Sequence, residues 1–299
     1  MSNSLAAARR RRVAACLTAA CAVFLLAISG CASDSVRANL AVLQQKQQLI
    51  AAVRAGLLLA VDQEKNALLS PSQAEARQFL DSARDGMAAV KRDMGKLTQL
   101  VEETDNEKEM TALGAVAVDF KDMAAVDATL RGLAGRNTNL RAAQLSRTEG
   151  ALAVSRLQQA LTPVIDAPDC RAGRDALRIV TAALSVLSLH AQHIDEKTAA
   201  GMDGLEAAMN RQHARAEAAF DELAGLADPA VVAVLPPAKA AYTDFWRVTQ
   251  EVLTLSRENT NIEAVALSMG KKRLVTAKAL ADLDALQAVV AEKEFTATR

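Results

Sequence analysis

Apolar residues recur at alternating spacings of three and four through most of the chain after residue 36. One such stretch contains Ile50, Val53, Leu57 and Val61, and a later one contains Leu177, Val180, Leu184 and Leu187. This spacing puts one apolar stripe along each helix, which is typical of helices that pack in a bundle. Capping or helix-breaking residues interrupt the pattern near 70–71, 104–105, 137, 163–173, 201, 228–229 and 259. These breaks predict eight helices.

The second half of the chain repeats the first. The tripeptide Asn137-Thr138-Asn139 returns 122 residues later as Asn259-Thr260-Asn261. Further matches at this spacing pair Ala142 with Ala264, Leu145 with Leu267, Ser146 with Ser268, Leu152 with Leu274, and Leu161 with Leu283. A shared helical period could generate the apolar matches, but it does not explain a repeated polar tripeptide. We infer a duplication with four helices in each copy.

The expected fold is therefore all-α, with two tandem antiparallel up-down four-helix bundles. Copy one spans residues 36–166 and copy two spans residues 167–299. Because the stretch 163–173 contains prolines, the fourth helix should not run straight into the fifth. We expect the two bundles to lie side by side or to hinge at this stretch, with hairpin turns near residues 137 and 259.

The N-terminus has the composition of a bacterial export signal. Arg9 to Arg12 form a basic cluster, and residues 13–28 carry no charge but are too few to span a bilayer comfortably. The following Ile28-Ser29-Gly30-Cys31 resembles the lipobox of bacterial lipoproteins. We expect residues 1–30 to be a cleaved signal peptide, Cys31 to be lipidated, and residues 31–35 to be a tether. The alternative is an uncleaved membrane anchor in which Cys31 is an ordinary thiol.

Export and lipidation set the expected location and partners. The chain should be periplasmic in a Gram-negative bacterium and anchored to a membrane through its lipid. By resemblance to enterobacterial lipoproteins, Ala32 after the cysteine favours the outer membrane over the inner membrane. Without residues 1–30 the chain has 31 basic and 35 acidic residues, a balance that gives no reason to expect nucleic acid. Cys170 is interpreted as an unreactive thiol, with a disulfide-linked homodimer as the alternative.

The second copy resembles a known family. Residues 255–261 (LSRENTN) and 266–273 (ALSMGKKR) look like the last helical hairpin of the four-helix-bundle sensor domains of methyl-accepting chemotaxis proteins. Residues 62–66 with Pro71 resemble the first inter-helix turn of that family, and residues 294–299 resemble the segment before its second membrane helix. A chemoreceptor of this family continues into a second membrane helix and a signalling coiled coil, which we do not expect in this protein. The resemblance thus implies a sensor-like module that passes any signal to an envelope partner.

The two tripeptides are the main candidate site. One interpretation is helix capping, since Thr260 and Glu263 fit a capping box, whereas copy one has Arg141 in place of the glutamate. The other interpretation comes from the resemblance, which implies that this turn lines a pocket for a small ligand. The candidate ligand-binding residues are Asn137, Thr138, Asn139, Asn259, Thr260 and Asn261.

The histidines are weaker candidates. His190, His193 and His213 lie in one predicted hairpin, and His190 and His213 should occupy nearby levels on facing helices. A metal site needs at least three converging ligands, so we expect no metal and no cofactor, with His190 and His213 as weak candidates only. No phosphate-binding loop, nucleophile elbow or paired-histidine zinc helix occurs, so the chain is not expected to be an enzyme. Trp246 should pack beside Phe245.

Two functions remain open at this point. The leading hypothesis is a periplasmic, lipid-anchored sensor-like module that binds a small ligand, a signalling partner or both. The alternative is a structural or interaction lipoprotein that acts as a helical spacer or docking surface. A polar cavity inside a bundle favours sensing, whereas a dry, fully packed seam favours the structural hypothesis.

Overall fold

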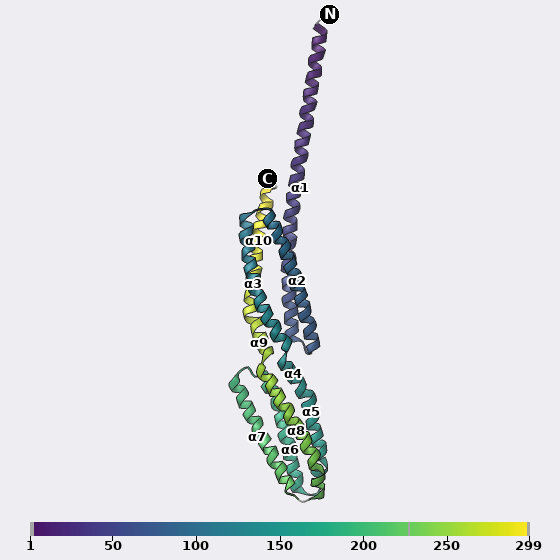
Figure 1. Cartoon of the computed structure of the whole chain (residues 1–299), viewed down its shortest axis with the longest axis vertical. Coiled ribbons are helices and arrows are strands. Elements are labelled where there is room, and N and C mark those ends of the chain that lie inside the picture. Colours follow the sequence, from purple (N-terminus) through teal and green to yellow (C-terminus); the bar gives the residue numbers. More distant parts are fainter. Residues whose placement is uncertain (1–2, 227, 298–299) are drawn as a thin grey trace. The chain divides into compact units, whose positions relative to one another are not determined.

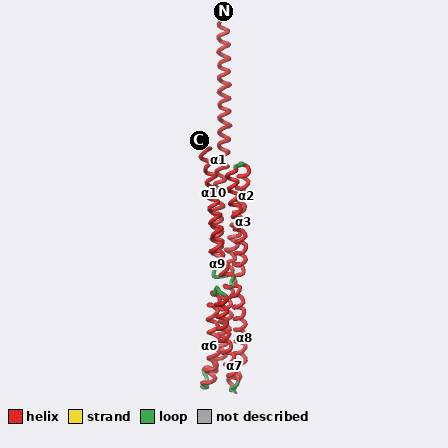
Figure 2. Tube along the Cα trace, turned by 90° about the vertical axis from the view of Figure 1, so that its left-hand side faces the viewer, coloured by secondary structure: helices red, strands yellow, loops and turns green. Residues whose placement is uncertain are grey.

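The computed structural model describes the backbone of residues 3–226 and 228–297 and the side chains of residues 36–226 and 228–292. Every regular element in these ranges is helical, which confirms the all-α class (Figures 1 and 2). The helices are α1 (Asn3–Leu69), α2 (Gln73–Glu103), α3 (Glu107–Arg136), α4 (Thr138–Leu145), α5 (Ala151–Ile165), α6 (Cys170–Asp195), α7 (Ala199–Ala224), α8 (Pro229–Glu258), α9 (Thr260–Leu267) and α10 (Arg273–Ala297). Two π-helical turns, η1 (Ser146–Gly150) and η2 (Ser268–Lys272), connect α4 to α5 and α9 to α10.

Local capping explains where several helices begin. Asp169 accepts a 2.8 Å hydrogen bond from Arg171 N at the start of α6, and Thr198 accepts one of 3.1 Å from Gly201 N in α7. Asp228 accepts from Ala230 N at 2.7 Å, with Pro229 in the first turn of α8. These side chains satisfy N–H groups that have no partner inside the helix. The helix ends lie at or near the breaks that the sequence predicts.

The breaks at 137 and 259 are much shorter than hairpin turns. A single residue separates α3 from α4, and a single residue separates α8 from α9. Asn137 (φ 49°) and Asn259 (φ 53°) adopt the left-handed conformation, which asparagine tolerates better than most residues. A helical hairpin needs a loop of about two to five residues, so these positions interrupt a helix without supplying such a loop.

The chain divides into two compact units, each built from separate segments. The first unit contains Met1–Ala60, Arg84–Asp122 and Val275–Arg299, and the second contains Val61–Ala83 and Met123–Leu274. The core of the first unit includes side chains from α1, α2, α3 and α10, namely Leu43, Ile50, Val53, Val90, Leu97, Val101, Leu113, Val116, Leu283, Leu286 and Val290. The core of the second unit includes side chains from α5, α6, α7 and α8, among them Leu157, Leu161, Ile179, Val186, Phe220 and Phe245.

These cores differ from the expected division into residues 36–166 and 167–299. In the first unit, α10 from copy two packs with three helices of copy one. In the second unit, α5 from copy one packs with three helices of copy two. The physical reason is the one-residue break at Asn137 and at Asn259. With no loop there, the last helix of each copy does not fold back onto its own copy.

No helix has a stretch both long and apolar enough to cross a membrane, judged over the residues whose side chains are described. The apolar run 13–28 and the lipidation candidate Cys31 lie outside those residues. Cys170 is exposed and is the first residue of α6.

Candidate functional site

The two Asn-Thr-Asn tripeptides meet in the second unit and bond to each other. Thr138 N donates to Thr260 Oγ1 at 3.0 Å, and Thr260 N donates to Thr138 Oγ1 at 3.3 Å. The two hydroxyl oxygens are 3.1 Å apart, so one donates to the other. Asn139 N donates to Asn261 Oδ1 and Asn261 N donates to Asn139 Oδ1, both at 3.2 Å. Each tripeptide therefore satisfies the first N–H groups of the other copy's helix.

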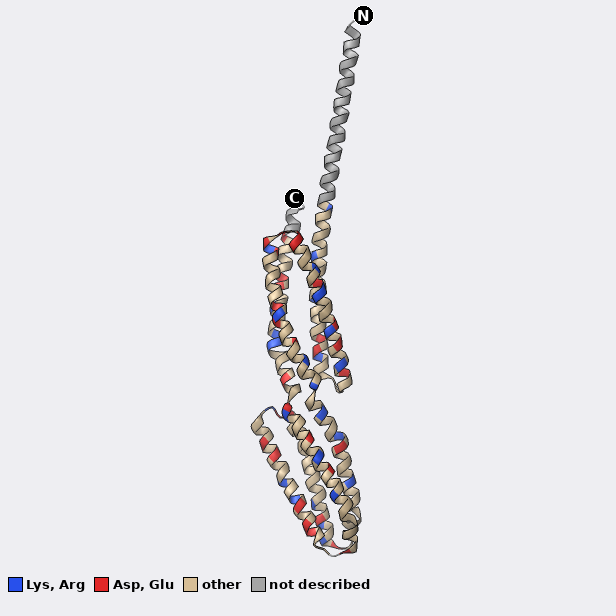
Figure 3. Ribbon diagram, viewed as in Figure 1, with Lys and Arg blue, Asp and Glu red and all other residues tan. Residues whose placement is uncertain are grey.

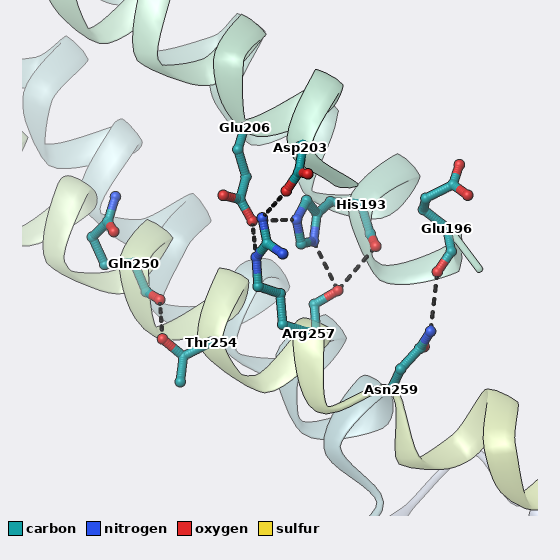
Figure 4. A network of polar contacts seen from close by, with 9 residues as sticks. His193, Glu196, Asp203, Glu206, Gln250, Thr254, Arg257 and Asn259 are labelled. Atoms are coloured by element: carbon teal, nitrogen blue, oxygen red, sulfur yellow. Dashed lines mark hydrogen bonds and ion pairs between the residues drawn. The ribbon is translucent and has the colours of Figure 1, made fainter. Parts of the chain in front are cut away.

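The amide groups of the asparagines complete this arrangement. Asn139 Nδ2 donates to Asn259 Oδ1 at 2.9 Å, and Asn261 Nδ2 donates to Asn137 Oδ1. Asn139 Nδ2 also donates to Ile194 O at 2.8 Å, while Asn259 Nδ2 donates to Glu196 O at 3.3 Å (Figure 4). The last two bonds hold the end of α6 against the paired tripeptides.

Capping therefore operates between the copies. Thr260 and Glu263 do not form the expected capping box, because the Thr260 hydroxyl accepts from Thr138 N instead. Among the described residues, neither Asn137 nor Asn259 caps its own helix through its side chain. Asn137, Thr138, Asn139 and Thr260 are buried, whereas Asn259 and Asn261 are half-buried. A nearby groove of about 460 Å³ is lined by Ser146, Arg147, Leu187, Ser188 and Asp195, among others, and by no tripeptide residue.

His190 of α6 lies fully buried between two hydroxyl groups. Its Nδ1 is 2.9 Å from Ser146 Oγ, and its Nε2 is 3.2 Å from Thr249 Oγ1. Because Thr249 donates its own proton to Phe245 O at 3.0 Å, it accepts from His190 Nε2. Nδ1 then accepts from Ser146, and the ring is neutral. Burial, with a smaller contribution in the same direction from His193, lowers the pKa of His190 to about 4.

His193, one helical turn further along α6, uses its nitrogens differently (Figure 4). Nδ1 is 2.8 Å from Ser256 Oγ, and that hydroxyl donates to His193 O at 2.9 Å. The serine therefore accepts from Nδ1, while Nε2 lies 3.0 Å from Glu206 Oε1. Both ring nitrogens thus donate.

Glu206 joins this histidine to an arginine on α8. Arg257 Nε donates to Glu206 Oε1 at 2.5 Å, and Arg257 Nη2 donates to Asp203 Oδ1 at 2.5 Å. The hydrogen bond from Arg257 lowers the pKa of Glu206, with a smaller contribution in the same direction from His193. The network links α6, α7 and α8 through charged hydrogen bonds at one level.

Ser256, His193 and Glu206 form a connected serine–histidine–carboxylate set, but its geometry does not activate a nucleophile. Ser256 and His193 are fully buried, so a substrate cannot reach the hydroxyl. The serine proton is already donated to His193 O, and the facing Nδ1 is itself a donor. A general base must be able to accept the proton of its nucleophile. The set is built to hold helices together.

His213 has partners of its own. Its Nδ1 is 2.9 Å from Tyr242 Oη, and its ring stacks on Trp246 with centroids 3.8 Å apart and planes 4° apart. Burial lowers the pKa of His213. His190 and His213 thus have different hydrogen-bond partners, and no group of three potential metal ligands occurs among the described residues. Trp246 packs against the core of the second unit, which confirms the prediction for that residue.

Sequence reasoning did not assign roles to Ser146, His193, Glu206, Thr249 or Arg257. Ser146 appeared as a repeat match with Ser268, which was a usable signal. The partners of the others are set by how α6, α7 and α8 align, and one sequence does not show that alignment.

No protein-family model matches the chain, and no curated protein matches it.

The buried neutral His190 makes a specific contribution to pH dependence. Between pH 6.5 and about 4 the unfolded chain binds a proton at this residue that the folded chain rejects, so stability falls as the pH falls. Urea unfolding at pH 7.0 and 4.5 measures this effect. Between these pH values the free energy of unfolding of wild type should fall by about 2 kcal/mol more than that of His190→Gln.

His213→Gln is the comparison variant. Burial also lowers the pKa of His213, but because this side chain is only half-buried, the variant should reduce the loss by less than His190→Gln does. Equal losses in wild type and His190→Gln would contradict the assignment of a neutral, buried imidazole.

Proposed function

We propose that the chain is a lipid-anchored helical interaction module of the bacterial envelope, which serves as a spacer or docking surface and has no catalytic role. One observation carries this proposal. The tripeptide residues, which were the candidate ligand contacts, direct their polar groups at each other and at the end of α6. A ligand at this position would have to replace these bonds, at a cost of about 1–3 kcal/mol for each buried group left without a partner.

The membership of the two cores supports a particular architecture. We propose two four-helix bundles, eight helical segments in all, in which each copy contributes its last helix to the other copy's bundle. Acidic and basic residues are interspersed along the helices within each unit (Figure 3). Such mixed charge suits a solvated surface. We further propose that these helices are related in origin to chemoreceptor sensor domains, although residues 255–273 do not form the hairpin that the resemblance implies.

The lipid at Cys31 is the proposed attachment to the membrane. The basic cluster, the short apolar run and the box that ends at Cys31 support this proposal. The proposed location is the periplasm, with the outer membrane preferred.

A second candidate function is the binding of a small anion, and a separate groove favours it. This groove has a volume of about 860 Å³ and lies along α6 and α7, with Arg174, Arg178 and Arg215 among its lining residues. Arg178 is paired with Asp175 and Glu222. Arg215 makes only a 3.5 Å contact with Gln212. Its guanidinium is therefore more available than that of Arg178 to bind a carboxylate or phosphate.

A ligand panel separates the two candidates. A ligand that binds the folded state raises its melting temperature. If the chain is an interaction module that binds none of them, then amino acids, organic acids, inorganic phosphate and divalent metals should cause no saturable rise in thermal unfolding. A saturable rise that disappears in Arg215→Ala would favour the anion-binding function. A rise that disappears in Asn139→Ala but persists in Arg215→Ala would overturn the argument from the tripeptides.

The lipid anchor has its own test. In cells given a labelled fatty acid, the wild-type chain should incorporate label and its mature N-terminus should be Cys31. Cys31→Ser should take up no label, whereas Cys170→Ser, the matched control, should be labelled like wild type. A full-length, unlabelled wild-type chain in the membrane fraction would support the uncleaved anchor instead.

A further inference from the structure

The second unit buries two carboxylates around a single lysine. Glu64 of α1, Asp127 of α3 and Lys272 of η2 each have a side chain that is 2% exposed. Lys272 Nζ lies 3.1 Å from Glu64 Oε2 and also pairs with Asp127. With both carboxylates ionised, the group carries one excess negative charge in a site that excludes water.

The lysine does not satisfy the two acids equally. Lys272 donates a hydrogen bond to Asp127 Oδ1. Apart from its 3.1 Å contact with Lys272, Glu64 has no hydrogen-bond partner among the residues that the structure describes. An ionised carboxylate in this position would lose its hydration and gain only an ammonium group that it shares with Asp127, which is costly.

A comparison inside the same chain shows what a balanced buried pair looks like. In the first unit, Lys46 pairs with Glu109 and donates to Thr104 Oγ1 at 2.6 Å. The other oxygen of Glu109 accepts from Asn106 Nδ2 at 3.1 Å. That site has one charge of each sign, and both carboxylate oxygens have donors. The site around Lys272 has neither property.

The duplication shows that these charges are not needed to form the fold. At the spacing of 122 residues, Lys272 corresponds to Gly150, the last residue of η1, and Asp127 corresponds to Thr249. Thr249 belongs to the uncharged contact with His190. The same π-helical turn therefore forms in copy one without a lysine or an acidic partner. π-Helical turns often occur at functional sites.

We propose that Glu64 is a proton-binding site, in which the carboxyl group of Glu64 stays protonated above the pH at which an exposed glutamate ionises, while Asp127 and Lys272 remain an ion pair. The charged groups that face Glu64 are Asp127 and Arg131 of α3 and Lys272 of η2. Burial raises the pKa of Glu64, and the charge of Asp127 raises it further, whereas Lys272 and Arg131 lower it.

The direction of the pH response follows from linkage. Because the pKa of Glu64 is raised on folding, its contribution to stability is full below the unfolded pKa and is lost as the pH rises through the folded value. This is opposite in sign to the response of His190. Alkalinisation therefore introduces an uncompensated charge between α1, α3 and η2, which makes this group a pH-sensitive element of the second unit.

Infrared spectroscopy of the full chain tests the proposal directly. In a pH titration, the C=O band of protonated carboxylic acid in wild type should persist to a higher pH than an exposed glutamate allows, and Glu64→Gln should lose this late-titrating band. Asp127→Asn should also lose this band, although Glu64 is still present, because one ammonium then faces one carboxylate and Glu64 ionises. Glu263→Gln, which alters an exposed glutamate of the same unit, should keep the band.

The outcomes are separable. A titration without a late-titrating band, or one that Glu64→Gln leaves unchanged, would overturn the proposal. A band that survives in Asp127→Asn would overturn the charge-balance argument. Urea unfolding from pH 5 to 8 supplies the second measurement, in which Glu64→Gln, nearly isosteric, should be more stable than wild type at pH 8 and show a weaker fall in stability as the pH rises.

Discussion

The reciprocal hydrogen bonding of Thr138 and Thr260 is the constraint on which the rest of the second unit depends. Each helix that begins at one of these residues has buried N–H groups with no partner in its own turn, and each receives that partner from the other copy. Two interrupted helices therefore complete their N-termini only when they lie together. The left-handed Asn137 and Asn259 make this possible, because they break each helix without adding a loop.

The polar residues around this pair differ in how their charge is balanced. His190 is neutral between two hydroxyls, and His193 donates to Ser256 and to Glu206. These contacts satisfy their groups and connect α6 to α8 and α7. Glu64 is the exception, since its only partner in a buried site is an ammonium group shared with Asp127. The second unit thus combines a hydrogen-bond network, suited to the proposed interaction module, with the proposed proton-binding site at Glu64.

Much of the fold could be predicted because it depends on local signals. Helix spacing, the caps at Asp169, Thr198 and Asp228, and the repeated tripeptide are all visible in the sequence. The exchange of α5 and α10 between copies could not be predicted, because apolar stripes of similar spacing fit either partner. The six tripeptide residues stand out in the sequence as a repeat, but their hydrogen bonds to one another were not predicted. Asn137 breaks a helix without reversing the chain because of its backbone conformation, which the sequence does not specify. The partners of Glu64 and His193 depend on how the helices align, which one sequence does not show.

A double-mutant cycle of Thr138→Val and Thr260→Val tests the central claim most directly, with urea unfolding as the readout. Each single change should lower the free energy of unfolding by about 1–3 kcal/mol, because a buried N–H group loses its acceptor. The double variant should cost about 1 kcal/mol less than the sum, since both changes remove the same hydroxyl–hydroxyl bond. As controls, Thr129→Val and Thr254→Val change exposed sites in α3 and α8. Their effects on the free energy of unfolding should be small and additive. Additive effects within about 0.5 kcal/mol for Thr138 and Thr260 would contradict direct bonding between the copies.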